Sequence, residues 1–268
     1  MNIVSEPSGS AAARVTCPSC EARTSCVGQG ADASALRQLD QVVEKRLSLA
    51  AGAYLYRIGD PFRSLYAVRA GCLKNSIRDE KGRDHVMGFH MLGDVVGVGG
   101  IETRAYIFDM RALEPSEVCE VPFDKLEALA HRVPALHPNI MKIFGRYRSR
   151  DARTQFLRRE GSTDVRVAGF LVDFCRRLEE RGSDPASLRL PMSRADIGDY
   201  LGLSADEVGK AFARLGERGI AKVWRKTIKV SSIEGLRSLA AGRAGRGLAT
   251  PAVLTTDGPS QEGAHHEP

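Results

Sequence analysis

Three cysteines near the start of the chain carry the clearest chemistry in the sequence. Cys17 and Cys20 are separated by two residues, and Cys26 follows after five more. The chain has six cysteines in 268 residues, and its first residues do not form a secretion signal, so we expect it in the cytoplasm, where thiols stay reduced. Clustered thiols in such a chain indicate metal or iron–sulfur ligation, or redox chemistry.

A four-coordinate thiolate site needs one more ligand than this cluster provides. Both zinc and iron–sulfur clusters accept four cysteines. Cys175 lies beside Phe174 on the apolar side of a predicted helix, and Cys72 follows a glycine in a predicted strand, so a structural role is favoured for both. Cys119 lies in another predicted strand, and its spacing alone does not decide its role.

The elements that must position these thiols begin with a series of short strands. Between residues 47 and 123, apolar runs of four to six residues alternate with turns that contain glycine, which predicts an antiparallel barrel or sandwich. The predicted strands are 55–58, 65–68, 73–77, 85–89, 108–113 and 118–121.

A long helix is predicted over residues 134–159. A seam with alternating spacings of four and three consists of Ile140, Phe144, Tyr147, Asp151, Thr154 and Arg158. Such a seam favours a dimer helix, and the alternative is a helix packed on its own barrel. In a symmetric dimer Asp151 would face its own copy, which is destabilising unless Arg148 neutralises it.

The segment from Met192 to Val230 predicts a winged helix-turn-helix. Ser193 and Ser204 are N-cap candidates with an acid three residues later, and Gly202 supplies the turn. The exposed side of the second helix would enter the major groove, and it carries Ala205, Asp206, Gly209, Lys210 and Arg214. Strands 220–224 and 227–230, joined by Arg225 and Lys226, form a basic wing suited to phosphates. The alternative is a winged helix used only for protein contacts.

Length and composition fit this organisation. A chain of 268 residues suggests about two domains. The net charge of +6 is compatible with nucleic acid but is weak evidence alone, and no apolar run reaches the roughly 18 residues of a membrane helix. The expected organisation is a disordered start (1–15), a cysteine segment with a lead-in helix (16–46), a sensor domain (47–133), a dimerisation helix (134–160), a DNA-binding domain (161–234) and a disordered tail (241–268).

These motifs together resemble the CRP/FNR family, and within it the oxygen-responsive regulators. The similarity runs from Cys17 to about Leu239. Besides the cysteine spacing, it is carried by 64–71 (SLYAVRAG), 88–97 (GFHMLGDVVG), 118–123 (VCEVPF) and 196–203 (DIGDYLGL). The resemblance implies an α+β fold with an N-terminal antiparallel β-roll of the cyclic-nucleotide-binding kind.

The resemblance also implies the cofactor and the switch. Cys17, Cys20, Cys26 and Cys119 would bind a [4Fe-4S] cluster, the intact cluster would favour a homodimer on palindromic double-stranded DNA, and oxygen would release the dimer. Asp151 matches the family's acidic seam residue, whose repulsion weakens the apo dimer. We further expect an activator that meets RNA polymerase through the loop 79–84.

Several positions depart from the family pattern. Ser25 precedes the third cysteine where a bulky apolar residue is usual, and Asp206, Gly209 and Lys210 replace the base-reading Glu, Ser and Arg. Ser204 would still cap the reading helix. The barrel lacks the Gly-Glu and Arg-Ser cassette that binds cyclic nucleotide phosphate, so no cyclic nucleotide is expected.

Two rival functions remain open at this point. One is a regulator of the same fold whose cysteines hold zinc or switch as thiols. The other is an iron–sulfur enzyme or electron carrier, which is disfavoured because the sequence offers no nucleophile–base pair and no phosphate loop. We therefore expect no enzymatic activity.

Overall fold

Two antiparallel sheets form the β-roll in the computed structural model of the chain, which describes residues 4–5 and 16–242. One sheet has the order β1-β2-β9-β4-β7 and the other β3-β8-β5-β6. The strands are β1 (Val4–Ser5), β2 (Lys45–Leu49), β3 (Tyr54–Tyr56), β4 (Ser64–Ala70), β5 (Cys72–Arg78), β6 (Asp84–Met91), β7 (Val95–Val96), β8 (Asp109–Ala112) and β9 (Ser116–Pro122). The antiparallel β-roll expected from the turn-punctuated strands is confirmed.

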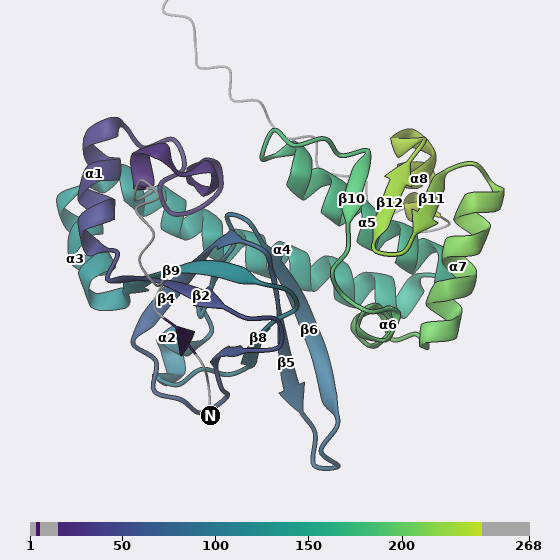
Figure 1. Cartoon of the computed structure of the whole chain (residues 1–268), viewed down its shortest axis with the longest axis horizontal. Helices are drawn as coiled ribbons and strands as arrows, with labels where there is room; N and C mark the ends of the chain where they lie inside the picture. The colour runs from purple at the N-terminus through teal and green to yellow at the C-terminus, as the bar shows by residue number, and fades with distance from the viewer. Residues whose placement is uncertain (1–3, 6–15, 243–268) are drawn as a thin grey trace, which may run out of the picture.

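Helices pack against the β-roll, and the longest of them connects it to the rest of the chain (Figure 1). They are α1 (Ala33–Val42), the short α2 (Gly100–Thr103), α3 (Phe123–Arg132) and α4 (His137–Glu160). The first core lies between the sheets and includes Val68, Leu73 and Val118, and α4 contributes Ile143 to it. The long helix of the sequence prediction is therefore present, and its first half packs on the β-roll.

The C-terminal domain is a winged helix-turn-helix. It comprises α5 (Thr163–Glu179), β10 (Ser187–Arg189), α6 (Arg194–Leu201), α7 (Ala205–Glu217), β11 (Ala221–Trp224), β12 (Thr227–Val230) and α8 (Ile233–Ala241). Both predicted capping boxes form, Ser193 with Asp196 and Ser204 with Glu207. Gly202 ends α6 at a φ of +68°, a conformation that favours glycine.

The sequence prediction missed some elements and misplaced others. It did not include β2, β7, α3 or α8, and Val4–Ser5, placed in a disordered start, pair with β2. Helix α8 contains Ala241, where the tail was expected to begin. The remaining parts of the predicted disordered start and tail lie outside the described residues. Among the described residues, no helix is long and apolar enough to cross a membrane.

Candidate functional site

All four cysteines assigned to the cofactor line one pocket at the N-terminal end of the β-roll. The segment with η1 (Cys17–Ser19) and η2 (Glu21–Thr24) passes over β4 and β9, and Cys119 lies on β9. The pocket has an empty volume of about 450 Å³ including its open mouth. Residues that are about 100 positions apart in sequence therefore meet at one site.

The wall of this pocket is apolar, with cations close to the thiols. Its apolar members are Ala22, Val27, Leu36, Leu39, Val43, Ala67 and Val121. Arg69 lines the pocket, and the charges of Arg69 and Arg46 favour a thiolate at Cys119. A dry wall with nearby cations suits a group held by several thiolates, which carries negative charge.

Burial favours the protonated form of three of these thiols, Cys17, Cys26 and Cys119, when nothing is bound to them. It raises the pKa of Cys119 to about 11. Burial also raises the pKa of Cys17, helped by Asp40, whose carboxylate accepts a 2.9 Å hydrogen bond from the Cys17 backbone N–H. Burial raises the pKa of Cys26 too, although the Gly28 N–H donates to its sulfur and opposes this. Metal ligation at such a site must displace protons from the thiols.

The thiols surround the pocket instead of meeting at a single point. In the part of the chain that the structure describes, no three His, Cys, Asp or Glu side chains could hold one metal ion. A [4Fe-4S] cluster has four irons and takes four thiolates, so it suits ligands that are spread around a pocket. The donor set, the apolar wall and the neighbouring cations fit such a cluster.

The other two cysteines lie elsewhere. Cys72 and Cys175 are buried in the second core, which joins the C-terminal domain to the outer face of β5 and β6. Burial raises the pKa of Cys72 to about 12 and that of Cys175 to about 11. Neither residue lines the cysteine pocket.

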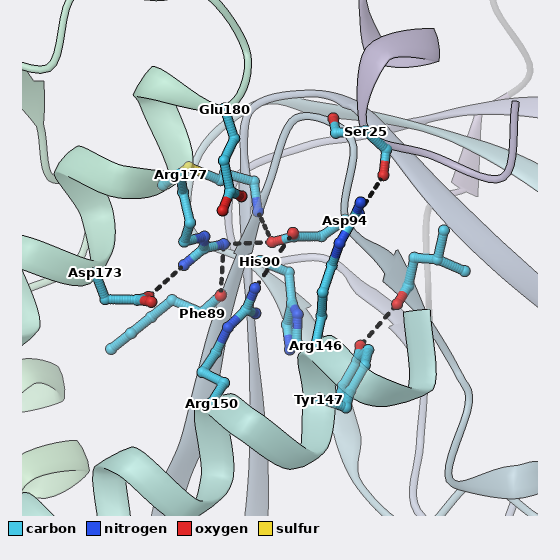
Figure 2. A network of polar contacts seen from close by, with 12 residues as sticks. Ser25, Phe89, His90, Asp94, Arg146, Tyr147, Arg150, Asp173, Arg177 and Glu180 are labelled. Carbon is cyan, nitrogen blue, oxygen red and sulfur yellow. Dashed lines mark hydrogen bonds and ion pairs between the residues drawn. The ribbon is translucent and has the colours of Figure 1, made fainter. Parts of the chain in front are cut away.

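Helix α4 holds the backbone of the cysteine segment. The Asn139 amide donates to the carbonyl oxygens of Val27 and Gln29 at 3.0 and 2.6 Å. Arg146 donates to the Ser25 carbonyl at 2.6 Å and also bonds the Gln29 side chain (Figure 2). The sequence analysis missed both residues, because nothing in the local pattern of α4 indicates a partner more than 100 positions away.

Ser25 lies against the β-roll and does not line the cysteine pocket. It is buried, and a Cβ added at Gly93 would lie 1.7 Å from its hydroxyl oxygen. The serine that replaces the usual bulky apolar residue before the third cysteine therefore contacts the turn that carries Asp94.

Asp94 is the centre of a buried ionic network between the β-roll, α4 and α5 (Figure 2). Its carboxylate pairs with Arg177, with Arg181 at 3.0 Å and with Arg150 at 3.5 Å. Burial opposes its ionisation, but the three guanidinium groups hold the pKa of Asp94 well below its usual range. Arg177, whose side chain is 2% exposed, also pairs with Asp173. The network thus connects the turn beneath Ser25 to both helices.

The expected dimer seam divides between two environments. Ile140 and Tyr147 pack against the first core, and the Tyr147 hydroxyl donates to the Val95 carbonyl at 2.7 Å. Packing on the chain's own barrel, the alternative interpretation, therefore accounts for these two. Phe144 is half-buried, whereas Arg148 and Asp151 are exposed on α4.

The exposed face of α7 carries the predicted base-reading positions. Asp206 and Lys210 are both exposed and form an ion pair at 2.7 Å. The Arg194 guanidinium of α6 lies over Gly209, 3.3 Å from where a Cβ would be. The Ser204 hydroxyl accepts from the Glu207 N–H in the helix cap. A cation and an acid are therefore presented together on this helix.

The remaining residues predicted to contact DNA differ in whether another side chain of the protein already binds them. Arg214 bonds to the Asp164 carboxylate of α5 at 2.6 and 2.9 Å, so it is already partnered. Arg225 and Lys226 form the exposed turn between β11 and β12.

The helix-turn-helix is docked on the β5–β6 hairpin. Asp196 pairs with Lys74, and Asp199 accepts from the Val86 N–H and contacts His85 at 3.3 Å. Phe89 packs edge-on against Tyr200, with ring centroids 5.3 Å apart. The first helix of the helix-turn-helix therefore contacts the β-roll directly.

Comparison with family models identifies both halves of the chain. Residues 46–133 match the cyclic nucleotide-binding domain, and residues 165–239 match the Crp-like helix-turn-helix domain. The first match describes the β-roll, and the second describes the domain that contains α5 to α8.

Similar proteins cover nearly the whole chain. The transcriptional activator protein Anr of Pseudomonas aeruginosa is 33% identical over 85% of this chain and 93% of its own length. The fumarate and nitrate reduction regulatory protein of Yersinia pestis is 33% identical over 84% and 90%. Among solved structures, FixK2 from Bradyrhizobium japonicum has a TM-score of 0.65 at 26% identity, over 73% of this chain and 96% of that one.

Proposed function

The chain belongs to the CRP/FNR family of transcription regulators, and on that premise we propose that it is an oxygen-responsive activator. In this proposal it binds palindromic DNA as a homodimer when a [4Fe-4S] cluster is intact. Its similarity to transcriptional activators and its Crp-like domain make it a DNA-binding regulator and not an enzyme. The observation that carries the proposal is that Cys17, Cys20, Cys26 and Cys119 line one pocket.

These four cysteines would hold the cluster. When bound, it would supply iron–sulfur bonds that tie the N-terminal segment to β9. Other residues of the chain shape the site. The apolar wall excludes water, and Asp40 orients the Cys17 backbone. Ser25 does not line the pocket, so access of oxygen would depend on the wall residues.

Contacts of the cysteine segment give a physical route to α4. Asn139 and Arg146 hold backbone carbonyls between Ser25 and Gln29, so the order of that segment and the position of α4 are coupled. Arg148 and Asp151 lie exposed on the same helix, where a second copy would bring like charges together. A modest differential stability of a few kcal/mol is enough to shift a population between two states.

The DNA-binding and activating surfaces follow from the fold. We assign base contacts to Asp206 and Lys210, with Gly209 permitting close approach, and phosphate contacts to Arg225 and Lys226. The loop 79–84 at the tip of the β5–β6 hairpin projects from the β-roll (Figure 1) and is the proposed contact for RNA polymerase. A cyclic nucleotide is not part of the proposal, because the phosphate-binding cassette is missing from the sequence.

Anaerobic purification tests the proposal directly. We expect an iron–sulfur absorption band, dimers by light scattering and a shifted DNA band, all lost together after exposure to air. Stoichiometric zinc without iron, or air-dependent thiol oxidation without an iron–sulfur band, would replace the proposal with the zinc or thiol alternative.

A further inference from the structure

The wing of the C-terminal domain carries an exposed aromatic residue that the contacts described above do not use. Trp224 is the only tryptophan of the chain, and it is 73% exposed. It pairs with Thr227 across the β11–β12 hairpin, directly before the Arg225–Lys226 turn. An exposed tryptophan loses the favourable burial of a large apolar surface, so its position at a turn needs a partner to explain it.

The turn itself is in a conformation that favours glycine. Arg225 has a φ of +53°, and the Trp224–Thr227 pairing leaves a loop of only two residues. A positive φ at the first of two loop residues is typical of a type II′ turn, where glycine is preferred. An arginine in this position is strained, and such strain persists where a side chain has a function.

Cations surround this aromatic residue without acidic partners. Lys222 and Lys229 are directly opposite each other across the hairpin, an arrangement of like charges that is destabilising. In the described part of the chain, the ion pairs of the C-terminal domain use other cations, such as Lys210 and Arg214, and none includes a hairpin cation. The Arg225 guanidinium lies 5.8 Å from the Trp224 ring centroid.

The hairpin tip is continuous with the DNA-binding face. The Leu190 N–H donates to the Lys226 carbonyl at 2.7 Å, which fastens the tip to the segment that begins α6. Arg194, in the first turn of α6, lies over Gly209 on the exposed face of α7. A duplex whose major groove receives α7 therefore presents its flanking backbone to the hairpin.

We propose that Trp224 packs against the deoxyribose surface of the minor groove that flanks each half-site, while the hairpin cations contact the adjoining phosphates. DNA is a polyanion whose sugars present an apolar edge. Its binding would offset three unfavourable features of the free hairpin, namely the exposed ring, the strained Arg225 and the Lys222–Lys229 repulsion. This inference goes beyond the proposed function and requires only that the protein binds DNA.

The single tryptophan makes the test direct. The probe is a duplex of about 40 bp that carries a binding site selected from a random pool, added to the anaerobic protein at low salt, with binding followed in parallel by mobility shift. We expect DNA to quench the tryptophan fluorescence and to reduce its accessibility to acrylamide, whereas a duplex truncated at the half-site edges should bind without this protection. A shifted band with unchanged fluorescence would overturn the role of Trp224 and leave the proposed function intact. A protein that shifts no duplex at any salt would contradict DNA binding itself.

Variants separate apolar from ionic contacts. Trp224→Ala should weaken binding about tenfold without changing the dependence on salt. Lys226→Ala should reduce the slope of log K against log salt by about 1. Ile58→Ala, at an exposed apolar position on the β-roll, is the matched control and should change neither quantity.

Arg225→Gly should raise the melting temperature while it weakens binding, because it relieves the strain and removes a cation. Wild-type affinity in Trp224→Ala would overturn the proposal.

Discussion

Arg146 of α4 donates a 2.6 Å hydrogen bond to the backbone carbonyl of Ser25, the residue that precedes the third cysteine of the pocket. A guanidinium on the proposed dimerisation helix thus bonds directly to the backbone of the segment that is proposed to hold the cofactor. Asn139, whose side chain is buried, makes two further bonds of this kind. Coupling between the two sites can pass through these contacts without any long-range rearrangement.

Arg146→Ala should uncouple the pocket from DNA binding. The four thiols are untouched, so the iron content of the anaerobic protein should match that of wild type. The ratio of anaerobic to aerobic DNA affinity should fall about tenfold, the size of a typical coupling energy. The measurement is a DNA titration in both atmospheres, with Lys142→Ala, at an exposed cation of the same helix, as the control for loss of charge. An unchanged ratio in Arg146→Ala would remove this contact from the account.

Asp151→Ala should produce dimers in air. Asp151 lies on the exposed side of α4, and partial burial of its carboxylate already raises its pKa in the single chain. Removing it abolishes the repulsion expected between two copies, so dimerisation should strengthen by roughly tenfold. Light scattering of the aerobic variant measures this. A monomer with the same dissociation constant as wild type would mean that Arg148 already neutralises the seam, or that the seam lies elsewhere.

Much of the DNA-binding motif could be predicted from the sequence because its signals are local. The caps at Ser193 and Ser204 and the turn at Gly202 depend on residues within three or four positions. Strand β2 was missed because its apolar residues are few and its pairing with β9 spans about 70 positions. Likewise, the cysteine spacing indicated three ligands, but only the fold brings Cys119 to the same pocket.

The seam on α4 shows how a correct pattern can have two origins. The spacing predicted an apolar stripe, and the stripe exists, but Ile140 and Tyr147 use it to cover the β-roll core. A helix that packs on its own domain needs the same periodicity as one that packs on a second copy. Periodicity alone therefore could not assign the partner.

Lys210 should determine one base of the half-site. Its ammonium pairs with Asp206 in the structure. When α7 enters the groove, either this ion pair breaks or both side chains bond to the same base edge. Lys210→Ala should cost about 1–3 kcal/mol and relax one position, and selection from a random duplex pool measures both effects. Lys226→Ala is the comparison, since a phosphate contact weakens all sequences alike. Unchanged stringency at every position in Lys210→Ala would exclude Lys210 from base reading.

Docking of the helix-turn-helix on the β-roll should depend on pH through His85. Its hydrogen bond with Asp79, 3.1 Å away, and its contact with Asp199 raise the pKa of His85 above the ordinary value of 6.5. Nearby charged groups on the facing elements are Arg83, Lys74 and Asp196. Because the folded pKa is the higher one, the stabilisation is complete below 6.5 and is lost as pH rises through the raised value. A proton NMR titration of wild type and Asp199→Asn should show a higher pKa of His85 in wild type, and equal values would contradict the contribution of the docking contact.

The most direct test of the central claim is the iron and acid-labile sulfide content of six anaerobically purified variants, each with one cysteine replaced by serine. Replacing Cys17, Cys20, Cys26 or Cys119 should abolish cluster retention, because each of these thiols lines the pocket. Cys72→Ser and Cys175→Ser should retain wild-type content, because both residues lie in the second core. Full iron and sulfide content in Cys119→Ser would contradict the assignment of the pocket.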